Sequence, residues 1–588
     1  MYDIIKRYVD NENGNGLLLV DMPTGSGKTY SAIKYIFDAC MEPQNKDRRY
    51  IFVTTLKKNL PYKDLQQWFE KTGNQELYQE KVLVIDSNID SVVDGWSPEV
   101  ESAIPVEIKK TDEYKNFRRD LSFVKKQRED KSPMMREFLE SIEANLRDKT
   151  EPKFRRLVSD YLGKEYTTVD LRLYAIKTDK KWKWLGTLYP AVFTRERQVL
   201  FLSVDKLLSR NTTIVEPSYM FYNSDIIKDA VLFIDEFDAT KNTVLKKIIE
   251  NGLHDKVDYI ELFKDIYAAL HTDDFPAVLT TPSQERMMGE RRNKSLQSIV
   301  DDIRQKADYI HTTYSLQFKH RTMGEIADNY QNYLFQDHQF HTILNSNNSY
   351  ILMQSDQQRK INSIGFSQKK PKNECNNIQT MLGQLRGFIS YFQIAVSILA
   401  FNYMQCKNEH RREGEDVFSV ESAIRSVLAL FRLNDDSIDY LTIQIMMSPR
   451  KGKDEIAPSD FDLSFYEHGF RYYAFENDVE HDMQSQIMMY SFQNTPEKLL
   501  LKFCERAKVI GISATATVPS VIGNYDMEYL KSKMQDFYVE VSEEEKQRLA
   551  DSFQQEQEGY QNIKIHTKLL GKEEKYTEES WMEVFMVS

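Results

Sequence analysis

Cysteine is scarce in this chain of 588 residues, which contains only Cys40, Cys375, Cys406 and Cys504. These four cysteines show neither close pairing nor the spacing of a zinc site. The long interval between Cys40 and Cys375 contains none, which excludes an iron–sulfur cluster held by cysteines of that interval. A chain with so few cysteines is typical of a reducing compartment.

Other features are missing as well. The chain begins Met-Tyr-Asp-Ile-Ile-Lys, without the apolar core of a secretion signal. Its most apolar segment, Tyr391–Met404, includes Gln393 and Asn402, so we expect a buried helix rather than a membrane span. The net charge of −12 excludes a generally basic nucleic-acid coat but leaves a local binding groove possible. We therefore expect a cytoplasmic protein of several domains.

The strongest motif present is a glycine-rich loop near the start of the chain. Met22-Pro23-Thr24-Gly25-Ser26-Gly27-Lys28-Thr29 lies between the apolar run Leu17–Val20 and the helical stretch Tyr30–Met41. In a strand–loop–helix context, the backbone N–H groups of such a loop surround phosphates at a helix N-terminus. We expect residues Pro23 to Thr29 to bind a nucleotide, with Lys28 on the β- and γ-phosphates and Thr29 on Mg²⁺.

A second motif follows another apolar run. Residues Ala230–Ile234 end in Asp235-Glu236-Phe237-Asp238. An acidic pair after a buried strand is what a magnesium-dependent nucleotide hydrolase requires, so we assign Asp235 to the metal and Glu236 to the general base. The alternative is an acidic surface turn. The preceding phosphate-binding loop favours the catalytic assignment.

A third piece lies far downstream, where the apolar run Lys508–Ile512 leads into Ser513-Ala514-Thr515. Together the three pieces resemble superfamily 2 helicases and translocases of the DEAD/DEAH-like type. This resemblance places motif I at Met22–Thr29, motif Ia near Thr54-Thr55-Leu56-Lys57, motif II at Asp235–Asp238 and motif III at Ser513–Thr515.

The resemblance also implies functions for these segments. Asp238, Ser513 and Thr515 would couple the nucleotide site to nucleic-acid movement, and Thr54, Thr55 and Lys57 would contact nucleic acid. The preference for ATP rests on the resemblance alone. For Thr54 and Thr55, a purely structural helix-capping role is the alternative.

The expected fold class is α/β. Short apolar runs at 49–55, 81–86 and 198–203 are typical of buried parallel strands, so we predict a RecA-like sheet with two large insertions. The predicted boundaries are 1–88, 198–238 and 504–525 for the RecA-like lobe, 89–197 and 239–503 for the insertions, and 526–588 for a linker and possible start of a second lobe.

Within the first insertion, Lys177–Trp184 interleaves lysine with tryptophan. Such a segment can stack bases and neutralise phosphate, which makes Lys181, Trp182 and Trp184 candidate nucleic-acid contacts. A β-hairpin with tryptophan in its core predicts the same pattern equally well.

The second insertion is predicted to be mostly helical, with long amphipathic stretches at 293–311 and 377–404 and strands near 462–473 and 483–492. Insertions in these two places resemble the layout of DinG- and XPD-type helicases, whose second insertion forms an arch over DNA. This chain lacks the cysteines of their cluster.

A second RecA-like lobe needs about 150 residues, more than follow Thr515 here. The family's Gln-x-x-Gly-Arg-x-x-Arg pattern does not occur either. We therefore expect an N-terminal fragment or a split subunit of an ATP-dependent helicase or translocase, weak as a hydrolase alone. Its expected partners are nucleic acid, with DNA favoured over RNA, and a second-lobe subunit.

The alternative function is a nucleotide-dependent switch or scaffold that binds a protein partner. A weaker third alternative is a nuclease-associated subunit whose motor only remodels DNA.

Overall fold

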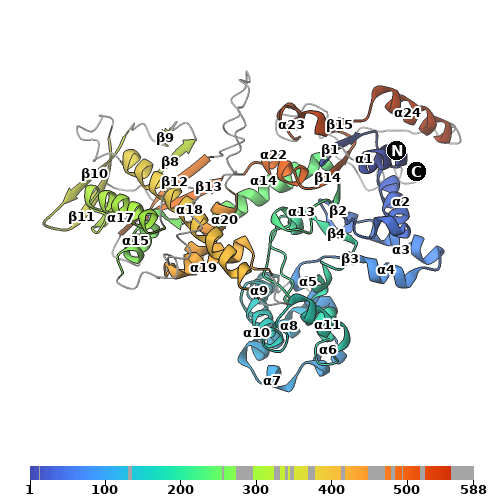
Figure 1. Cartoon of the computed structure of the whole chain (residues 1–588), viewed down its shortest axis with the longest axis horizontal. Helices are drawn as coiled ribbons and strands as arrows, with labels where there is room; N and C mark the ends of the chain where they lie inside the picture. The colour runs from blue at the N-terminus through green and yellow to red at the C-terminus, as the bar shows by residue number, and fades with distance from the viewer. Residues whose placement is uncertain are drawn as a thin grey trace, which may run out of the picture.

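A computed structural model (Figure 1) describes most of the chain. The described residues are 1–11, 14–129, 136–254, 257–272, 296–322, 332–337, 342–344, 350–367, 378–411, 417–447, 470–478, 484–492, 494–516 and 524–557. Figure 1 shows the central sheet with a helical unit below it and a larger mixed unit to one side.

Seven parallel strands form the central sheet, in the spatial order β15-β1-β14-β5-β2-β4-β3. All of them except β15 lie where the apolar runs predicted strands. The architecture is compatible with the expected RecA-like α/β fold. The strands are β1 (Gly16–Asp21), β2 (Tyr50–Thr54), β3 (Val82–Val84), β4 (Val199–Ser203), β5 (Val231–Asp235), β14 (Lys508–Ser513) and β15 (Tyr538–Glu540).

The sheet is buried on both faces, which explains why its strands read as continuous apolar runs. Successive side chains of a strand point to opposite faces, and β1 shows the result. Leu17 and Leu19 join one core, and Leu18 and Val20 join the other. The first core includes α13 (Val204–Leu207), α14 (Phe237–His254), α22 (Pro496–Cys504) and α23 (Met527–Met534), and the second includes α1 (Tyr2–Asp10), α2 (Lys28–Met41) and α3 (Tyr62–Lys71).

The strand register aligns the carboxyl ends of β1, β14 and β5. Asp21 lies opposite Ser513, and Ile512 lies opposite Asp235. Ligands of open parallel sheets bind at this edge, so the fold brings the three motifs together although they are far apart in the sequence.

The residues after motif III correct one predicted boundary. Strand β15 pairs in parallel with β1, and the buried Leu530 of α23 joins the core of the sheet. Val541 joins the opposite core, and Leu549 of α24 (Glu543–Gln557) packs against it. Residues 526–557 therefore complete the lobe that carries the motifs, and the prediction that they begin a linker is wrong. Residues 558–588, the rest of the segment predicted as a linker and possible start of a second lobe, lie outside the described residues.

The first insertion is helical, as predicted, and has its own core. Phe117 and Phe154 stack at its centre, with ring centroids 4.2 Å apart and an interplanar angle of 8°. The helices are α5 (Asn88–Gly95), α6 (Pro98–Ala103), α7 (Val106–Lys109), α8 (Asp112–Glu129), α9 (Arg136–Asn145), α10 (Glu151–Glu165), α11 (Val169–Thr178) and α12 (Trp184–Leu188).

The second insertion combines helices with two further sheets, in the orders β10-β11-β7 and β6-β13-β12-β8-β9. The helices are α15 (Tyr259–Leu270), α17 (Leu296–Thr313), α18 (Ile378–Glu409), α19 (Val420–Leu430) and α20 (Asp435–Met447). The strands are β6 (Val257–Asp258), β7 (Lys319–Thr322), β8 (Asn332–Asp337), β9 (Thr342–Leu344), β10 (Tyr350–Asp356), β11 (Ile361–Ser367), β12 (Phe470–Asp478) and β13 (Gln484–Phe492). The strands from β7 to β11 were not predicted from the sequence.

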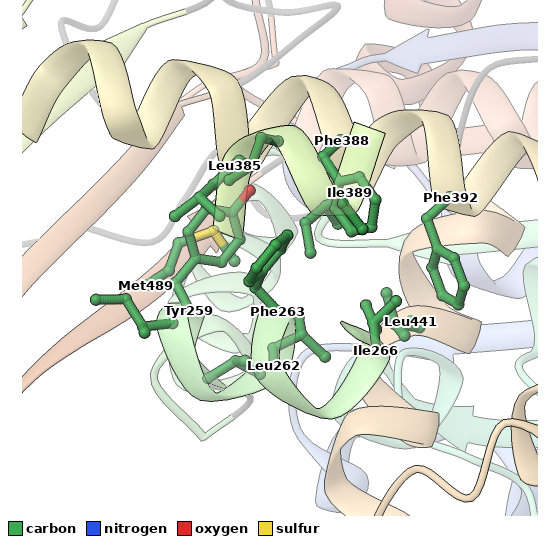
Figure 2. Close-up of a cluster of buried hydrophobic side chains, with 14 of the residues drawn as sticks. Tyr259, Leu262, Phe263, Ile266, Leu385, Phe388, Ile389, Phe392, Leu441 and Met489 are labelled. Carbon is green, nitrogen blue, oxygen red and sulfur yellow. The ribbon is translucent and has the colours of Figure 1, made fainter. Parts of the chain in front are cut away.

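Helix α18 is the centre of the core of the second insertion. Figure 2 shows its residues Leu385, Phe388 and Phe392 facing Phe263 and Ile266 of α15. The rings of Phe263 and Phe388 meet edge to face, 5.1 Å apart. Of the helices that the structure describes, only α18 is long and apolar enough to cross a membrane by length and composition. Here its apolar side chains build the core of the insertion.

Candidate nucleotide-binding site

The glycine-rich loop connects β1 directly to the N-terminus of α2. Gly25 and Gly27 have φ angles of 86° and 73°, in the left-handed region that glycine adopts without a steric penalty. Gly27 caps α2, and the helix begins at Lys28. The loop therefore presents a helix N-terminus with its unpaired N–H groups and its positive dipole end at the edge of the sheet.

Lys28 closes the loop on itself. Its Nζ donates hydrogen bonds to the carbonyl oxygens of Met22, at 2.6 Å, and Pro23, at 2.8 Å. Burial lowers the pKa of Lys28, although the carboxylates of Asp235 and Asp21 oppose this shift. The hydroxyl oxygen of Ser26 in the same loop is buried and has no hydrogen-bond partner among the described residues. The loop thus holds a half-buried cation and, two residues before it, a hydroxyl without a partner among the described residues.

Thr29 and Asp235 join the first two motifs. The Thr29 hydroxyl donates to Asp235 Oδ2 at 2.9 Å, across 206 positions of sequence. Asp235 is the last residue of β5, and burial raises the pKa of its carboxyl group despite the hydrogen bond from Thr29. The two residues predicted to bind the metal are therefore in contact, and the Thr29 hydroxyl and the Asp235 carboxylate lie together at the edge of the sheet.

Glu236 turns away from this pair. It has a φ of 53°, unusual for a residue other than glycine, and directly follows β5. Its carboxylate accepts hydrogen bonds from the Thr55 hydroxyl at 2.5 Å and from the Asn59 amide at 3.1 Å. Sequence reasoning placed Thr55 on nucleic acid and missed Asn59, because a lone asparagine in an exposed turn has no distinguishing pattern.

Asp238 is bound to motif III. It accepts hydrogen bonds from the Ser513 hydroxyl, at 2.8 Å, and from the Thr515 hydroxyl. Burial alone would raise the pKa of Asp238, but these hydrogen bonds outweigh it and hold the pKa below its ordinary value. The Met22 N–H donates to the carbonyl oxygen of Ser513 at 3.1 Å, so motif III also contacts the phosphate-binding loop. The three predicted coupling residues therefore form one cluster.

The motif Ia residues divide into buried and exposed members. Thr54 is buried, and its hydroxyl donates to the carbonyl oxygen of Leu56 at 2.8 Å, so it shapes the turn and does not present a surface for nucleic acid. Lys57 is half exposed and pairs with Asp86 at 2.8 Å. The structure therefore overturns the predicted nucleic-acid contact for Thr54 and places Lys57 at the surface.

The tryptophans of the first insertion are also corrected. Trp182 and Trp184 are buried in its core, and their indole N–H groups donate to Glu165 Oε2 and to the carbonyl oxygen of Lys181. Lys181 itself pairs with Glu165. The segment forms a helical turn leading into α12, so neither base stacking by the tryptophans nor a β-hairpin describes it. Apolar burial dominates because both rings join the core of the insertion beside α10, where Trp184 lies 6.4 Å from the ring of Phe154 and Trp182 donates to Glu165.

Comparisons with protein-family models and with curated proteins found no match to this chain.

Proposed function

We propose that this chain binds Mg²⁺-ATP at the edge of the central sheet and hydrolyses it, as the motor lobe of a superfamily 2-like helicase or translocase. The Thr29–Asp235 hydrogen bond carries the proposal. It joins a hydroxyl at the end of the glycine-rich loop, which follows β1, to a carboxylate at the end of β5, two strands away in the same parallel sheet. A phosphate-binding loop with such a carboxylate is the arrangement that nucleotide hydrolases require.

The residues present fit a nucleotide phosphate. The loop offers helix N-terminal N–H groups, the Lys28 ammonium and the buried Ser26 hydroxyl, which has no partner in the part of the chain that the structure describes. They also fit magnesium, which favours hydroxyl, carboxylate and phosphate oxygens and keeps several waters. Thr29 and Asp235 would hold this ion, which when bound neutralises phosphate charge. Among the described residues no group of three or more His, Cys, Asp or Glu side chains forms a separate metal site.

The remaining residues of the site have the chemistry for hydrolysis. Glu236 would take a proton from water while the water oxygen forms a bond to the γ-phosphorus. The bond from the γ-phosphorus to the bridging oxygen breaks, and ADP leaves with the electron pair. Lys28 would stabilise the negative charge that spreads over the transferred group.

The proposed coupling between the nucleotide site and nucleic acid rests on the fact that motif II, motif III and the turn after β2 lie at the same edge of the sheet. Asp238, two residues beyond the proposed base, accepts from Ser513 and Thr515, and Ser513 contacts the loop through Met22. Lys57 lies on the turn after β2 at the same edge. A change at the phosphates would therefore reach motif III and the basic turn through direct contacts.

A second candidate is a nucleotide-dependent switch that binds a protein partner. The observation that favours it is the second insertion, which builds a core of its own around α18 together with two sheets. A domain of this size offers a large surface for a partner protein.

Fluorescence anisotropy separates the two candidates. We would titrate labelled single-stranded DNA and RNA with the protein, with and without a non-hydrolysable ATP analogue, and measure analogue binding separately. The motor predicts strand binding that depends on nucleotide and weakens with salt, and that Lys28→Ala abolishes together with nucleotide binding. Tight nucleotide binding without any response to nucleic acid would support the switch. Failure of the wild-type protein to bind nucleotide would overturn both.

A further inference from the structure

The two adjacent carboxylates of motif II make contacts on opposite sides of β5. Asp235 accepts from Thr29, which follows β1, whereas Glu236 accepts from Thr55 and Asn59, which follow β2. The strand order places β5 between β14, the neighbour of β1, and β2. The proposed general base is therefore attached to the turn after β2 and not to the phosphate-binding loop.

This attachment is specific. Each carboxylate oxygen of Glu236 accepts from a different side chain, with the Thr55 hydroxyl on Oε2 and the Asn59 amide on Oε1. Glu236 also has a left-handed backbone conformation, which costs on the order of 1 kcal/mol in a residue that has a Cβ atom. Hydrogen bonds to a charged group are the stronger kind, so they stabilise this conformation.

The turn that holds Glu236 is exposed between two buried anchors. Thr54 and Leu60 are buried, whereas residues 56–59 are exposed, and Lys57–Asn59 form a short 3-10 helix. Lys57 and Lys58 lie on this turn, next to Leu56, whose residue surface is 52% exposed. The same short segment thus carries two lysines at the surface, of which Lys57 is paired with Asp86, and donates the two hydrogen bonds that hold the base.

We infer that Thr55 and Asn59 hold Glu236 away from the nucleotide phosphates, and that a nucleic-acid strand bound to the turn at 56–58 releases it for hydrolysis. Thr55 and Asn59 are positioning residues in this scheme. The phosphodiesters of a strand would pull on Lys57 and Lys58, and a small shift of the turn would break the hydrogen bonds to Glu236. The inference rests on the proposed function, since it assigns a regulatory role at the same site.

The test is steady-state ATP hydrolysis by the full chain, with and without a single-stranded oligonucleotide. Asn59→Ala and Thr55→Val should raise kcat without the strand by about tenfold, the change expected for losing a hydrogen bond to a charged group. KM for ATP should stay the same, and the strand should stimulate these variants less than the wild type. Thr55→Ser keeps the hydroxyl and should behave as the wild type.

Two further variants serve as controls. Gln66, on the exposed face of α3, makes the same kind of amide-to-carboxylate hydrogen bond to Glu70 at 2.8 Å, so Gln66→Ala should leave kcat unchanged. Adding Glu236→Gln to Asn59→Ala should abolish the gain, because the faster hydrolysis depends on the released carboxylate.

A binding measurement gives a readout that does not depend on turnover. Coupling between two sites is reciprocal, so the factor by which a non-hydrolysable analogue changes strand affinity should fall towards one in Asn59→Ala. If Asn59→Ala and Thr55→Val leave kcat unchanged, or lower it as Glu236→Gln is expected to do, the two residues support the active geometry and the inference is overturned. Even then, binding of the non-hydrolysable analogue by the wild-type protein would leave the proposed function intact.

Discussion

Lys241 and Glu497 form an ion pair at the base of the second insertion. Their side chains are 17% and 2% exposed, and the Nζ and Oε1 atoms lie 3.0 Å apart. Lys241 belongs to α14, on which the chain leaves the sheet, and Glu497 belongs to α22, on which it returns. Lys241 also donates to the carbonyl oxygen of Asn524, and Glu497 accepts from the N–H of Asp526. The pair therefore fastens both ends of the insertion to the segment that follows motif III.

We expect Lys241→Ala to destabilise the lobe by about 3–5 kcal/mol, because it leaves the Glu497 carboxylate buried without its cation. Urea unfolding followed by circular dichroism measures the loss. The double variant Lys241→Met with Glu497→Leu removes both charges and should recover most of it. A loss below about 1 kcal/mol in Lys241→Ala, the size typical of an exposed pair, would contradict this account.

Asp235→Asn should stabilise the nucleotide-free protein at neutral pH while abolishing hydrolysis. Burial raises the pKa of Asp235 above its value in the unfolded chain. The ionised carboxylate is therefore a cost to folding that is fully present above the raised folded pKa. This cost disappears as the pH falls below the unfolded value of about 3.9.

Thermal unfolding checks the sign of this effect. The Tm of Asp235→Asn should exceed that of the wild type at pH 7.5, and the difference should shrink as the pH approaches 4. A lower Tm for Asp235→Asn at pH 7.5 would show that the ionised carboxylate stabilises the fold through Thr29.

The central sheet, and the meeting of the three motifs at its edge, could be predicted from the sequence because both depend on local patterns. Continuous apolar runs predict buried parallel strands, and strands of this kind place Thr29, Asp235 and Ser513 at one edge. Strand β15 was missed because Tyr538–Glu540 is short and largely exposed, and only its pairing with β1 makes it a strand. Asn59 was missed because its role depends on a residue 177 positions away.

Nucleic-acid affinity should depend on Lys57 and not on Trp182. Trp182 is buried, with its indole N–H bonded to Glu165 at 2.9 Å. Trp182→Ala should destabilise the first insertion by about 3–5 kcal/mol, the cost of truncating a buried aromatic ring. Trp182→Phe keeps most of the ring and should bind single-stranded DNA as the wild type does.

Lys57→Ala provides the contrast, since this side chain is 49% exposed at the edge of the site. Loss of one phosphate contact should weaken strand binding and reduce the salt slope of the affinity by about one. Anisotropy titrations over a range of salt concentrations measure both quantities. If Trp182→Phe binds the strand more weakly and Lys57→Ala leaves the salt slope of strand affinity unchanged, the nucleic acid binds at the first insertion and not at the turn after β2.

Gly511 is needed on β14 because the ring of Phe237 packs directly against it. A Cβ atom at residue 511 would lie 2.7 Å from Cδ2 of Phe237, which is itself buried and packs against Tyr525 with ring centroids 4.8 Å apart. Gly511→Ala must therefore displace the residue between Glu236 and Asp238. We expect a destabilisation of about 1–3 kcal/mol, as in other overpacked cores, together with weaker nucleotide binding.

The matched control for this substitution is Gly387→Ala on α18, where a Cβ atom would meet none of the described residues within 4 Å. Alanine favours a helix over glycine by about 0.5–1 kcal/mol, so this variant should be as stable as the wild type or more so. Combining Gly511→Ala with Phe237→Leu should restore part of the lost stability, because the smaller side chain makes room for the new methyl group. If Gly511→Ala binds nucleotide as tightly as the wild type, the position of Phe237 does not set the geometry of the acidic residues on either side of it.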